Sequence, residues 1–309
     1  MKSMLDINGV LLLDKSKGKT SYQVLKEIKN MFLANKAGHT GSLDPLATGM
    51  LPIFFGESTK FIQYALNADK QYLVIAKLGV KTSTSDAEGE IIKIRAINVT
   101  KKQLCNQLGK FLGNVYQIPS MYSAIKYKGT PLYKYARKGI VINRSSRKIT
   151  IYNIDCIFFN QKYIKLNIFC SKGTYIRTLV DDLGEQLGCG AHVVSLRRIQ
   201  VDSYPMRKLV TIDQLYLIKN WCIKKKLIVS SYINKLLLPI DYPLLNFKTI
   251  KVTNIELKKL IVGQHIQLNK IFRITEIVVR IVDVSLKFVG VGYIDHRGIL
   301  IPKRLISQE

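Results

Sequence analysis

The chain alternates between short apolar runs and segments with helical periodicity. Nearly continuous apolar runs at 8–14 and 50–55 predict strands that are buried on both faces. Further β-type runs predict strands at 71–78, 90–95, 149–159, 162–170 and 192–198. Apolar residues that recur every three or four positions predict helices at 20–32, 57–66, 100–112, 174–184 and 211–220.

The starts and ends of these elements carry local signals. Thr20 to Gln23 has the pattern of a capping box, which marks a helix start. Tyr22, Leu25, Ile28 and Phe32 then recur at helical spacing and predict an apolar face. Near the other end, the prolines of 239–243 mark a linker, and short β-type runs at 277–284, 288–294 and 299–301 follow. They predict a small β-barrel-like module of about 60 residues.

Composition narrows the classes of partner. The chain has 309 residues, 47% of them hydrophobic, which indicates a globular protein with two domains. Lys and Arg number 48 against 21 Asp and Glu, a net charge of +27. Such a surplus favours an anionic partner, first nucleic acid and second an anionic membrane surface. Part of it is explained by an AT-rich coding sequence, which supplies Lys together with Ile and Asn.

The cysteines and the N-terminal residues indicate the cellular compartment of the protein. The five cysteines are odd in number and show no metal-ligand spacing, which indicates reduced thiols in a cytosolic protein. Residues 1–6 lack the apolar stretch of a secretory signal. No apolar run approaches the ~20 residues that a membrane span needs.

A glycine-rich loop at 38–49 precedes the second buried run. Its three glycines allow backbone angles and close approaches that other residues resist. Pro45 favours an extended Asp44, because a helical residue before proline clashes with the ring. A carboxylate on such a preset loop is typical of a nucleophile or a general base. An ordinary tight turn, in which Asp44 bonds its own backbone, explains the same residues.

Residues 119–148 interleave tyrosines with basic residues. Rings can stack on bases while cations meet phosphates, so this mixture favours a surface for single-stranded RNA. The alternative is an ordinary hairpin and helix with solvated lysines.

Arg177 lies in the first turn of a predicted helix, where the helix dipole disfavours a cation. It therefore calls for an anionic partner, and Asp44 is our candidate. Pairing with Asp181, four residues further on, is the alternative. Asp181 and Asp182 point about 100° apart on a helix, so we do not expect them to hold a metal together.

Long motifs occur in an order that resembles one enzyme family. They are NGVLLLDK at 8–15, GHTGSLDPLATG at 38–49, IPSMYSA at 118–124, SKGTYIRT at 171–178 and DDLGEQLGCGAH at 181–192. Together they resemble the TruB family of bacterial tRNA pseudouridine-55 synthases. The likeness is strong from residue 6 to about 215 and weak beyond 220, where the chain is similar to a reduced form of the family's C-terminal RNA-binding domain.

The resemblance implies an α/β (α+β) pseudouridine-synthase fold with a mixed, largely antiparallel sheet. It implies a catalytic domain over 1–240, with an RNA-clamping insertion at about 119–148, and a small PUA-type domain over 248–309. The implied substrate is uridine 55 in the T-loop of tRNA, which is flipped out and isomerised to pseudouridine. We expect no cofactor, metal, membrane or protein partner, and a cytoplasmic monomer.

The resemblance also implies residue roles. Asp44 matches the catalytic aspartate, and Arg177 matches the arginine paired with it, which we expect to favour the ionised form of Asp44. Tyr72 matches the aromatic residue that stacks on the target base.

Three further positions match substrate-binding residues of the family. Tyr175 and Leu196 match residues that line the pocket. His39 matches a residue that contacts the RNA near the flipped nucleotide.

Two other functions compete with this interpretation. A tRNA-folding chaperone needs the basic surface and the 119–148 segment, but it does not need a carboxylate beside phosphates. A nucleotidyl-transferase phosphate loop fits residues 38–41 only in part, because the second histidine of such loops is missing.

Overall fold

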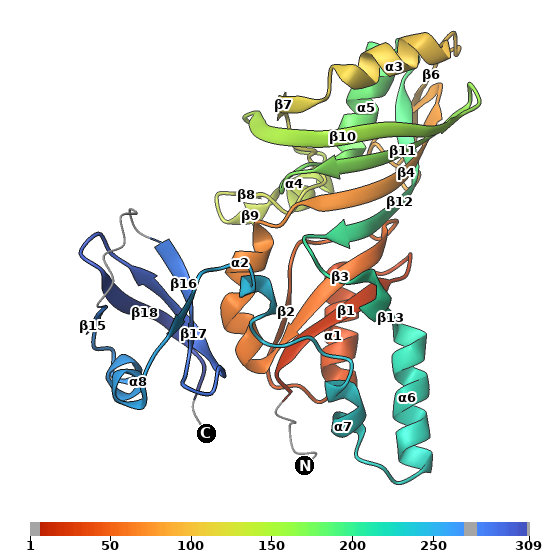
Figure 1. The fold of residues 1–309 in the computed structure, drawn as a ribbon. Helices are drawn as coiled ribbons and strands as arrows, with labels where there is room; N and C mark the ends of the chain where they lie inside the picture. Colours follow the sequence, from red (N-terminus) through yellow and green to blue (C-terminus); the bar gives the residue numbers. More distant parts are fainter. Residues whose placement is uncertain (1–6, 269–276, 308–309) are drawn as a thin grey trace.

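One large sheet organises most of the chain (Figure 1). The computed structural model describes residues 7–268 and 277–307. Residues 1–6, on which the expectation of no secretory signal rests, lie outside them, as do parts of the module expected at 248–309. The nine strands of the large sheet are β1 (Gly9–Lys15), β2 (Ala37–His39), β3 (Thr48–Phe55), β4 (Lys70–Leu78), β7 (Gly113–Gln117), β10 (Arg147–Phe159), β11 (Tyr163–Cys170), β12 (Ala191–Val201) and β13 (Val210–Thr211).

The strand order is β13-β1-β3-β12-β4-β11-β10-β7, with β2 beside β3. Only the β1–β13 and β3–β12 pairs are parallel among these strands. This confirms the predicted mixed, largely antiparallel sheet. Because β3 and β12 meet in the middle, the glycine-rich loop before β3 lies beside strands that are far away in the sequence.

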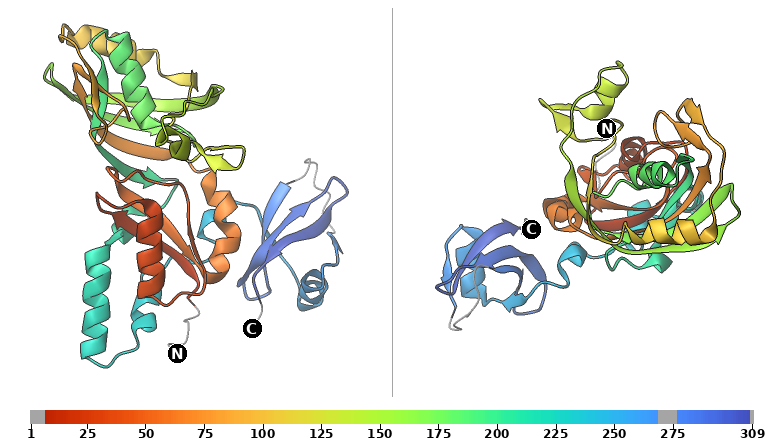
Figure 2. Two further views of the ribbon diagram at one scale, coloured as in Figure 1. Left: turned by 180° about the vertical axis from the view of Figure 1, so that it is seen from behind. Right: turned by 90° about the horizontal axis from the view of Figure 1, so that it is seen from above.

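Helices cover the sheet and complete its core (Figure 2). Buried side chains of α1, α3 and α5 join those of the strands in one apolar cluster. The helices before residue 240 are α1 (Ser21–Met31), α2 (Ile62–Leu66, after the 3-10 turn η1, Gly56–Phe61), α3 (Lys101–Gly109), α4 (Leu132–Ala136), α5 (Ile176–Gln186), α6 (Ile212–Lys224) and α7 (Val229–Asn234).

The first helix begins as predicted, and three of its four predicted apolar residues, Leu25, Ile28 and Phe32, pack in or against the core. The capping box between Thr20 and Gln23 is present, which confirms the helix start. Tyr22, however, is 69% exposed, while Val24, Ile28 and Met31 are buried. The buried stripe is centred on those three residues, and Tyr22 lies about 200° around the helix from Val24.

Two short hairpins extend from the large sheet. β5 (Val80–Thr82) pairs with β6 (Ile91–Ile94), which confirms the predicted turn at 82–89. β8 (Lys126–Tyr127) pairs with β9 (Thr130–Pro131) and leads into α4. This second hairpin and α4 project from the body of the molecule (Figure 2).

A separate five-stranded sheet follows the linker and confirms the expected small β module. Its order is β14-β16-β17-β18-β15, curled into a half-barrel beside α2 (Figure 1). Phe288 in this sheet packs edge-on against Phe61, with ring centroids 5.2 Å apart. The elements are the 3-10 turn η3 (Tyr242–Leu244), β14 (Thr249–Lys251), α8 (Asn254–Ile261), β15 (Ile266–Gln267), β16 (Ile277–Val282), β17 (Phe288–Ile294) and β18 (Ile299–Leu305).

Several elements have no counterpart in the sequence-based expectations, among them β2, β7, β13, β14, β15, α7 and α8. β2 and β7 are short, and their residues are half-exposed or exposed apart from Gln117. Such strands lack the alternating apolar pattern that would predict them.

Candidate active site

The loop that carries Asp44 is held at both sides by buried polar side chains. Lys15, on β1, is fully buried, and its Nζ donates to the carbonyl of Ala47 at 2.8 Å. Ser21, at the start of α1, accepts from the amide of Leu43 at 2.7 Å and donates to its carbonyl at 3.1 Å. The loop is therefore anchored on either side of Asp44.

The far end of the loop depends on glycine. Arg198, on β12, is 1% exposed and donates to the carbonyls of Met50 at 2.8 Å and Gly41 at 3.0 Å. Gly49 has φ +102°, and a Cβ there would lie 2.2 Å from the carbonyl oxygen of Arg198. No other residue fits at this crossing of β3 and β12 without moving one of the strands.

Arg177 joins two carboxylates. Its Nε lies 2.9 Å from Oδ2 of Asp44, and its Nη1 lies 3.2 Å from Oδ2 of Asp86. Nη2 donates to the carbonyl of Tyr122 at 3.0 Å, so all three nitrogens of this buried guanidinium have partners. The structure thus brings Arg177 to our candidate partner. Asp181 instead pairs with Lys81 at 3.3 Å, so the alternative was wrong.

Asp86 is a residue beside the site that the sequence reasoning missed. It lies in the turn between β5 and β6, more than 40 residues from Asp44 and 91 from Arg177. Its Oδ1 accepts from the hydroxyl of Thr84 at 2.5 Å and from the amide of Glu88 at 3.0 Å. These bonds are also those of an ordinary turn, so the sequence offered no signal for its contact with Arg177.

Burial and the neighbouring positive charges act in opposite directions on the pKa of Asp44. Desolvation raises the pKa of Asp44 above its ordinary value, and the negative charge of Asp86 adds to that rise. Arg177 and Lys15 act in the opposite direction without cancelling it. Arg177 favours ionised Asp44, as predicted, but burial outweighs it because a carboxylate loses hydration in the pocket.

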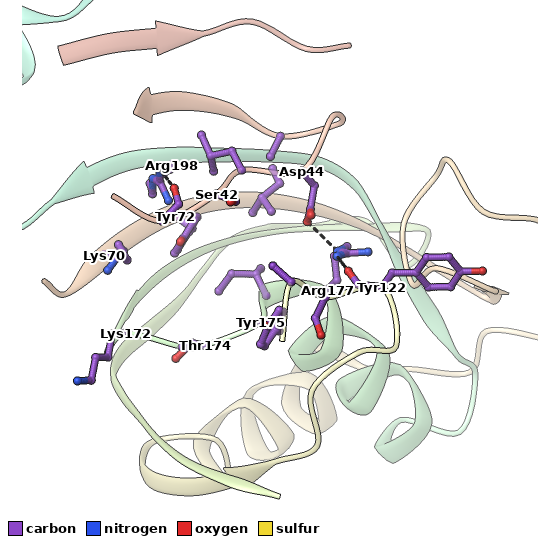
Figure 3. A pocket seen from close by; sticks show the side chains of 18 of the residues that line it. Ser42, Asp44, Lys70, Tyr72, Tyr122, Lys172, Thr174, Tyr175, Arg177 and Arg198 are labelled. Carbon is purple, nitrogen blue, oxygen red and sulfur yellow. Dashed lines mark hydrogen bonds and ion pairs between the residues drawn. The ribbon is translucent and has the colours of Figure 1, made fainter. Parts of the chain in front are cut away.

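A cavity of about 280 Å³ opens beside Asp44 (Figure 3). Tyr72, Tyr175 and Leu196 line it, together with Asp44 and Arg177, so the structure brings these five predicted residues together. The remaining lining residues are Gly41, Ser42, Leu43, Ala47, Leu66, Lys70, Tyr122, Ser123, Ala124, Lys172, Gly173, Thr174, Ile176 and Arg198.

The aromatic residues are fixed by their elements. Tyr72 is on β4 and is 8% exposed. Tyr175 precedes α5, and Gln117 of β7 bonds both its amide, at 2.9 Å, and its carbonyl, at 3.0 Å. Leu196, on β12, is buried as well. The cavity therefore has a wall of well-anchored aromatic and apolar side chains.

His39 is the predicted site residue that does not line this cavity. It ends β2, pairs with Ile53 of β3 and is half-buried. Burial lowers its pKa, and Arg198 lowers it further, so the ring favours its neutral form. Its proposed contact with RNA therefore lies outside the cavity itself.

Within the described ranges, no group of three or more His, Cys, Asp or Glu side chains could hold a metal ion. The five cysteines are free thiols. No helix in the described part of the chain is long and apolar enough to cross a membrane.

Comparisons with known proteins match consecutive parts of the chain to one family. The TruB family pseudouridylate synthase N-terminal domain matches residues 29–176, the tRNA pseudouridylate synthase B C-terminal domain matches 177–245, and the pseudouridine synthase II TruB C-terminal region matches 249–306. The chain is 48% identical over 300 residues to "tRNA pseudouridine synthase B" of Shewanella sp. (strain W3-18-1), covering 97% of this chain and 94% of the relative. The chain belongs to the TruB family.

Other relatives agree with this assignment. "tRNA pseudouridine synthase B" of Photorhabdus laumondii is 47% identical, over 98% of this chain and 96% of the relative. An H/ACA RNP structure bound to a substrate RNA containing 2′-deoxyuridine has a TM-score of 0.73 at 20% identity, covering 97% of this chain and 85% of that one. That likeness confirms the fold alone. The family predicted from the motifs is thus confirmed, and so is its enzyme class: this TruB family chain is a pseudouridine synthase.

Proposed function

We propose that this synthase converts uridine 55, in the T-loop of tRNA, to pseudouridine with Asp44 as the nucleophile. The observation that carries the proposal is the Asp44 carboxylate, held by Arg177 at 2.9 Å on the wall of the cavity that Tyr72 lines. The side chain of Asp44 keeps 39% of its surface exposed, so it can reach a substrate. The names of the relatives support tRNA as the substrate.

The chemistry requires little besides these groups. The N1–C1′ bond of the uridine breaks, the uracil turns, and C5 bonds to C1′. C5 loses a proton and N1 gains one, so the isomerisation balances without an oxidant, a reductant or a cofactor. Ionised Asp44 attacks either the base or the sugar, and the raised pKa of Asp44 makes this step sensitive to acid.

The target must leave its stack before it can reach Asp44. Flipping a nucleotide costs a few kcal/mol, which stacking on Tyr72 and phosphate contacts offset. For these contacts we propose the 119–148 insertion, where Lys128 lies 5.7 Å from the centre of the Tyr127 ring. His39 contacts the RNA near the flipped nucleotide, and the module after residue 248 binds the RNA farther away. We expect a cytoplasmic monomer that acts without protein partners.

The decisive experiment compares wild type with Asp44→Asn on an unmodified tRNA transcript. We expect pseudouridine at the T-loop uridine with wild type and at least ~10³-fold slower formation with Asp44→Asn, because the amide is a poor nucleophile. Binding of tRNA should change by less than about threefold. Asp202→Asn, in an exposed turn with φ 45°, is a matched control, because Asn tolerates this conformation.

Two outcomes would contradict the proposal. Full activity in a pure Asp44→Asn preparation would remove Asp44 from the role of nucleophile. Tight, salt-sensitive tRNA binding by wild type with no product would favour the tRNA-folding chaperone.

A further inference from the structure

Three cations at one end of the cavity lack carboxylate partners. The charged residues that line the cavity are Asp44, Lys70, Lys172, Arg177 and Arg198, four cations against one carboxylate. The carboxylates of Asp44 and Asp86 balance the positive charge of Arg177, with which both form ion pairs. Lys70, Lys172 and Arg198 form no ion pair with any described residue. We name these three residues the cationic end of the cavity.

Lys70 is the unusual member of this group. It is 7% exposed, although lysine is almost never buried without a partner. It lies two residues before Tyr72 on β4, so both side chains point to the same face of the sheet. Its Nζ donates one hydrogen bond among residues 7–268 and 277–307, to the carbonyl of Ala68. An ammonium has three donors, so two remain for a ligand in the cavity.

The other two cations line the same cavity and do not neutralise Lys70. Arg198 donates its hydrogen bonds to the carbonyls of Met50 and Gly41. Lys172 donates to the amide oxygen of Asn67 at 2.5 Å. Desolvation lowers the pKa of Lys70 to about 8, with Arg198 and Lys172 adding to the shift, while Cys170 and Asp69 oppose it. Like charges held together in this way favour an anion between them.

The position of the cationic end indicates which anion it takes. In Figure 3, Lys70 and Lys172 lie at one end of the cavity, and Asp44 and Arg177 lie at the other. Tyr72 stands between them. A uracil that stacks on Tyr72 with its glycosidic bond beside Asp44 is neutral, but its nucleotide carries a phosphodiester on either side.

We propose that Lys70, assisted by Lys172, binds a backbone phosphate that flanks the flipped uridine. The contact fixes the nucleotide in the cavity, and the anion supplies the countercharge that the protein lacks there. The inference rests on the proposed function and adds a binding residue to the same site. It also gives the site a preference for a nucleotide within a strand over a free nucleoside.

The test neutralises one phosphate at a time. T-arm stem-loop RNAs are made with all phosphates intact, or with a single uncharged methylphosphonate linkage on the 5′ or the 3′ side of the target uridine. Each RNA is assayed for pseudouridine formation and for binding with wild type, Lys70→Met and Lys77→Met. Lys77 is the matched control, because it is on the same strand but on the opposite face.

We expect Lys70→Met to lower kcat/KM on the intact RNA roughly 10- to 100-fold, the effect of losing one hydrogen bond to a charged group. Lys77→Met should stay within about twofold. One of the two methylphosphonates should cause a similar loss with wild type and almost none with Lys70→Met, because the contact is already gone. Lys70→Arg, which keeps the charge, should recover part of the activity.

The inference is overturned if the two changes act independently. In that case the loss of kcat/KM caused by Lys70→Met and the loss caused by either methylphosphonate multiply when the two are combined. If Lys70→Met does not fold, Lys172→Met, at the exposed end of the group, provides the same comparison. If wild type makes no pseudouridine from the intact RNA, the proposed function fails. The phosphate contact is then judged from the same pattern in the dissociation constants.

Discussion

Arg177 is shared between an accessible carboxylate and a buried one. Asp44 faces the cavity with 39% of its side chain exposed, while the side chain of Asp86 is 4% exposed. The negative charge of Asp86 contributes to the raised pKa of Asp44, after the larger effect of desolvation. Asp86 therefore acts through Arg177 and Asp44 and is not among the residues that line the cavity.

This arrangement predicts how activity depends on pH. Asp44 must be ionised to attack, so activity falls as the pH drops through its raised pKa. Asp86→Asn removes a negative charge, which lowers the pKa of Asp44 and moves the acid limb of the kcat/KM profile to lower pH. Losing the bond to the charged Arg177 should also lower the free energy of unfolding by about 1–3 kcal/mol.

The pH profile of pseudouridine formation and denaturant unfolding measure these two effects. Glu90→Gln, an exposed carboxylate of the same turn region, is the control and should leave the acid limb in place. An active Asp86→Asn enzyme with an unmoved acid limb would contradict the role assigned to Asp86.

At the scale of elements, the start of α1 has two separate functions. Thr20 caps the helix by accepting from the amide of Gln23. Ser21 reaches away from the helix to the backbone of Leu43, next to Asp44. Adjacent hydroxyls thus stabilise a helix and the loop that carries Asp44, and substitutions can separate the two effects.

We expect Ser21→Ala to lower the free energy of unfolding by about 1–3 kcal/mol, because it leaves buried backbone groups of Leu43 without partners. It should reduce kcat more than it changes KM, because the loop that positions Asp44 loosens. Thr20→Ala should cost about 1 kcal/mol because the helix loses its cap, with unchanged kinetics. Denaturant unfolding and steady-state kinetics distinguish the two, and identical kinetics in both variants would argue against loop positioning by Ser21.

At the scale of the whole molecule, the chain has a net charge of +27, and apolar contacts join the small C-terminal sheet to the elements before it. Phe61 is fully buried at this junction, with Phe288 and Leu244 in the same cluster. Removing the module would expose these side chains, so its part in RNA binding is better tested by charge than by truncation.

We predict that replacing Lys258 and Lys259 of α8 by Gln weakens tRNA binding and leaves kcat unchanged, because both are exposed and neither lines the cavity with Asp44. The slope of log K against log salt should fall by roughly 0.7–0.9 for each phosphate that is no longer neutralised. Replacing Lys224 and Lys225, exposed at the end of α6, is the matched control. Equal slopes for the two double variants in a salt titration would show that α8 binds no phosphate.

The elements with strong local patterns, and the family, could be predicted from the sequence alone. Buried strands such as β1 and β3, the capped helix α1 and the loop with Asp44 follow from neighbouring residues. The order and length of the motifs were sufficient to indicate the TruB family. A candidate pairing of Asp44 with Arg177 also followed, because a cation in the first turn of a helix needs an anion.

Which distant residues share the cavity depends on how the strands and loops pack in three dimensions. Asp86 lies in an ordinary turn and Lys70 begins an ordinary strand. Neither has a local sequence pattern that indicates its contacts. The raised pKa of Asp44 likewise depends on burial, which the pairing with Arg177 opposes without cancelling it. A sequence pattern depends on a few neighbouring residues, whereas burial and charge balance depend on strands and loops that meet across the sheet.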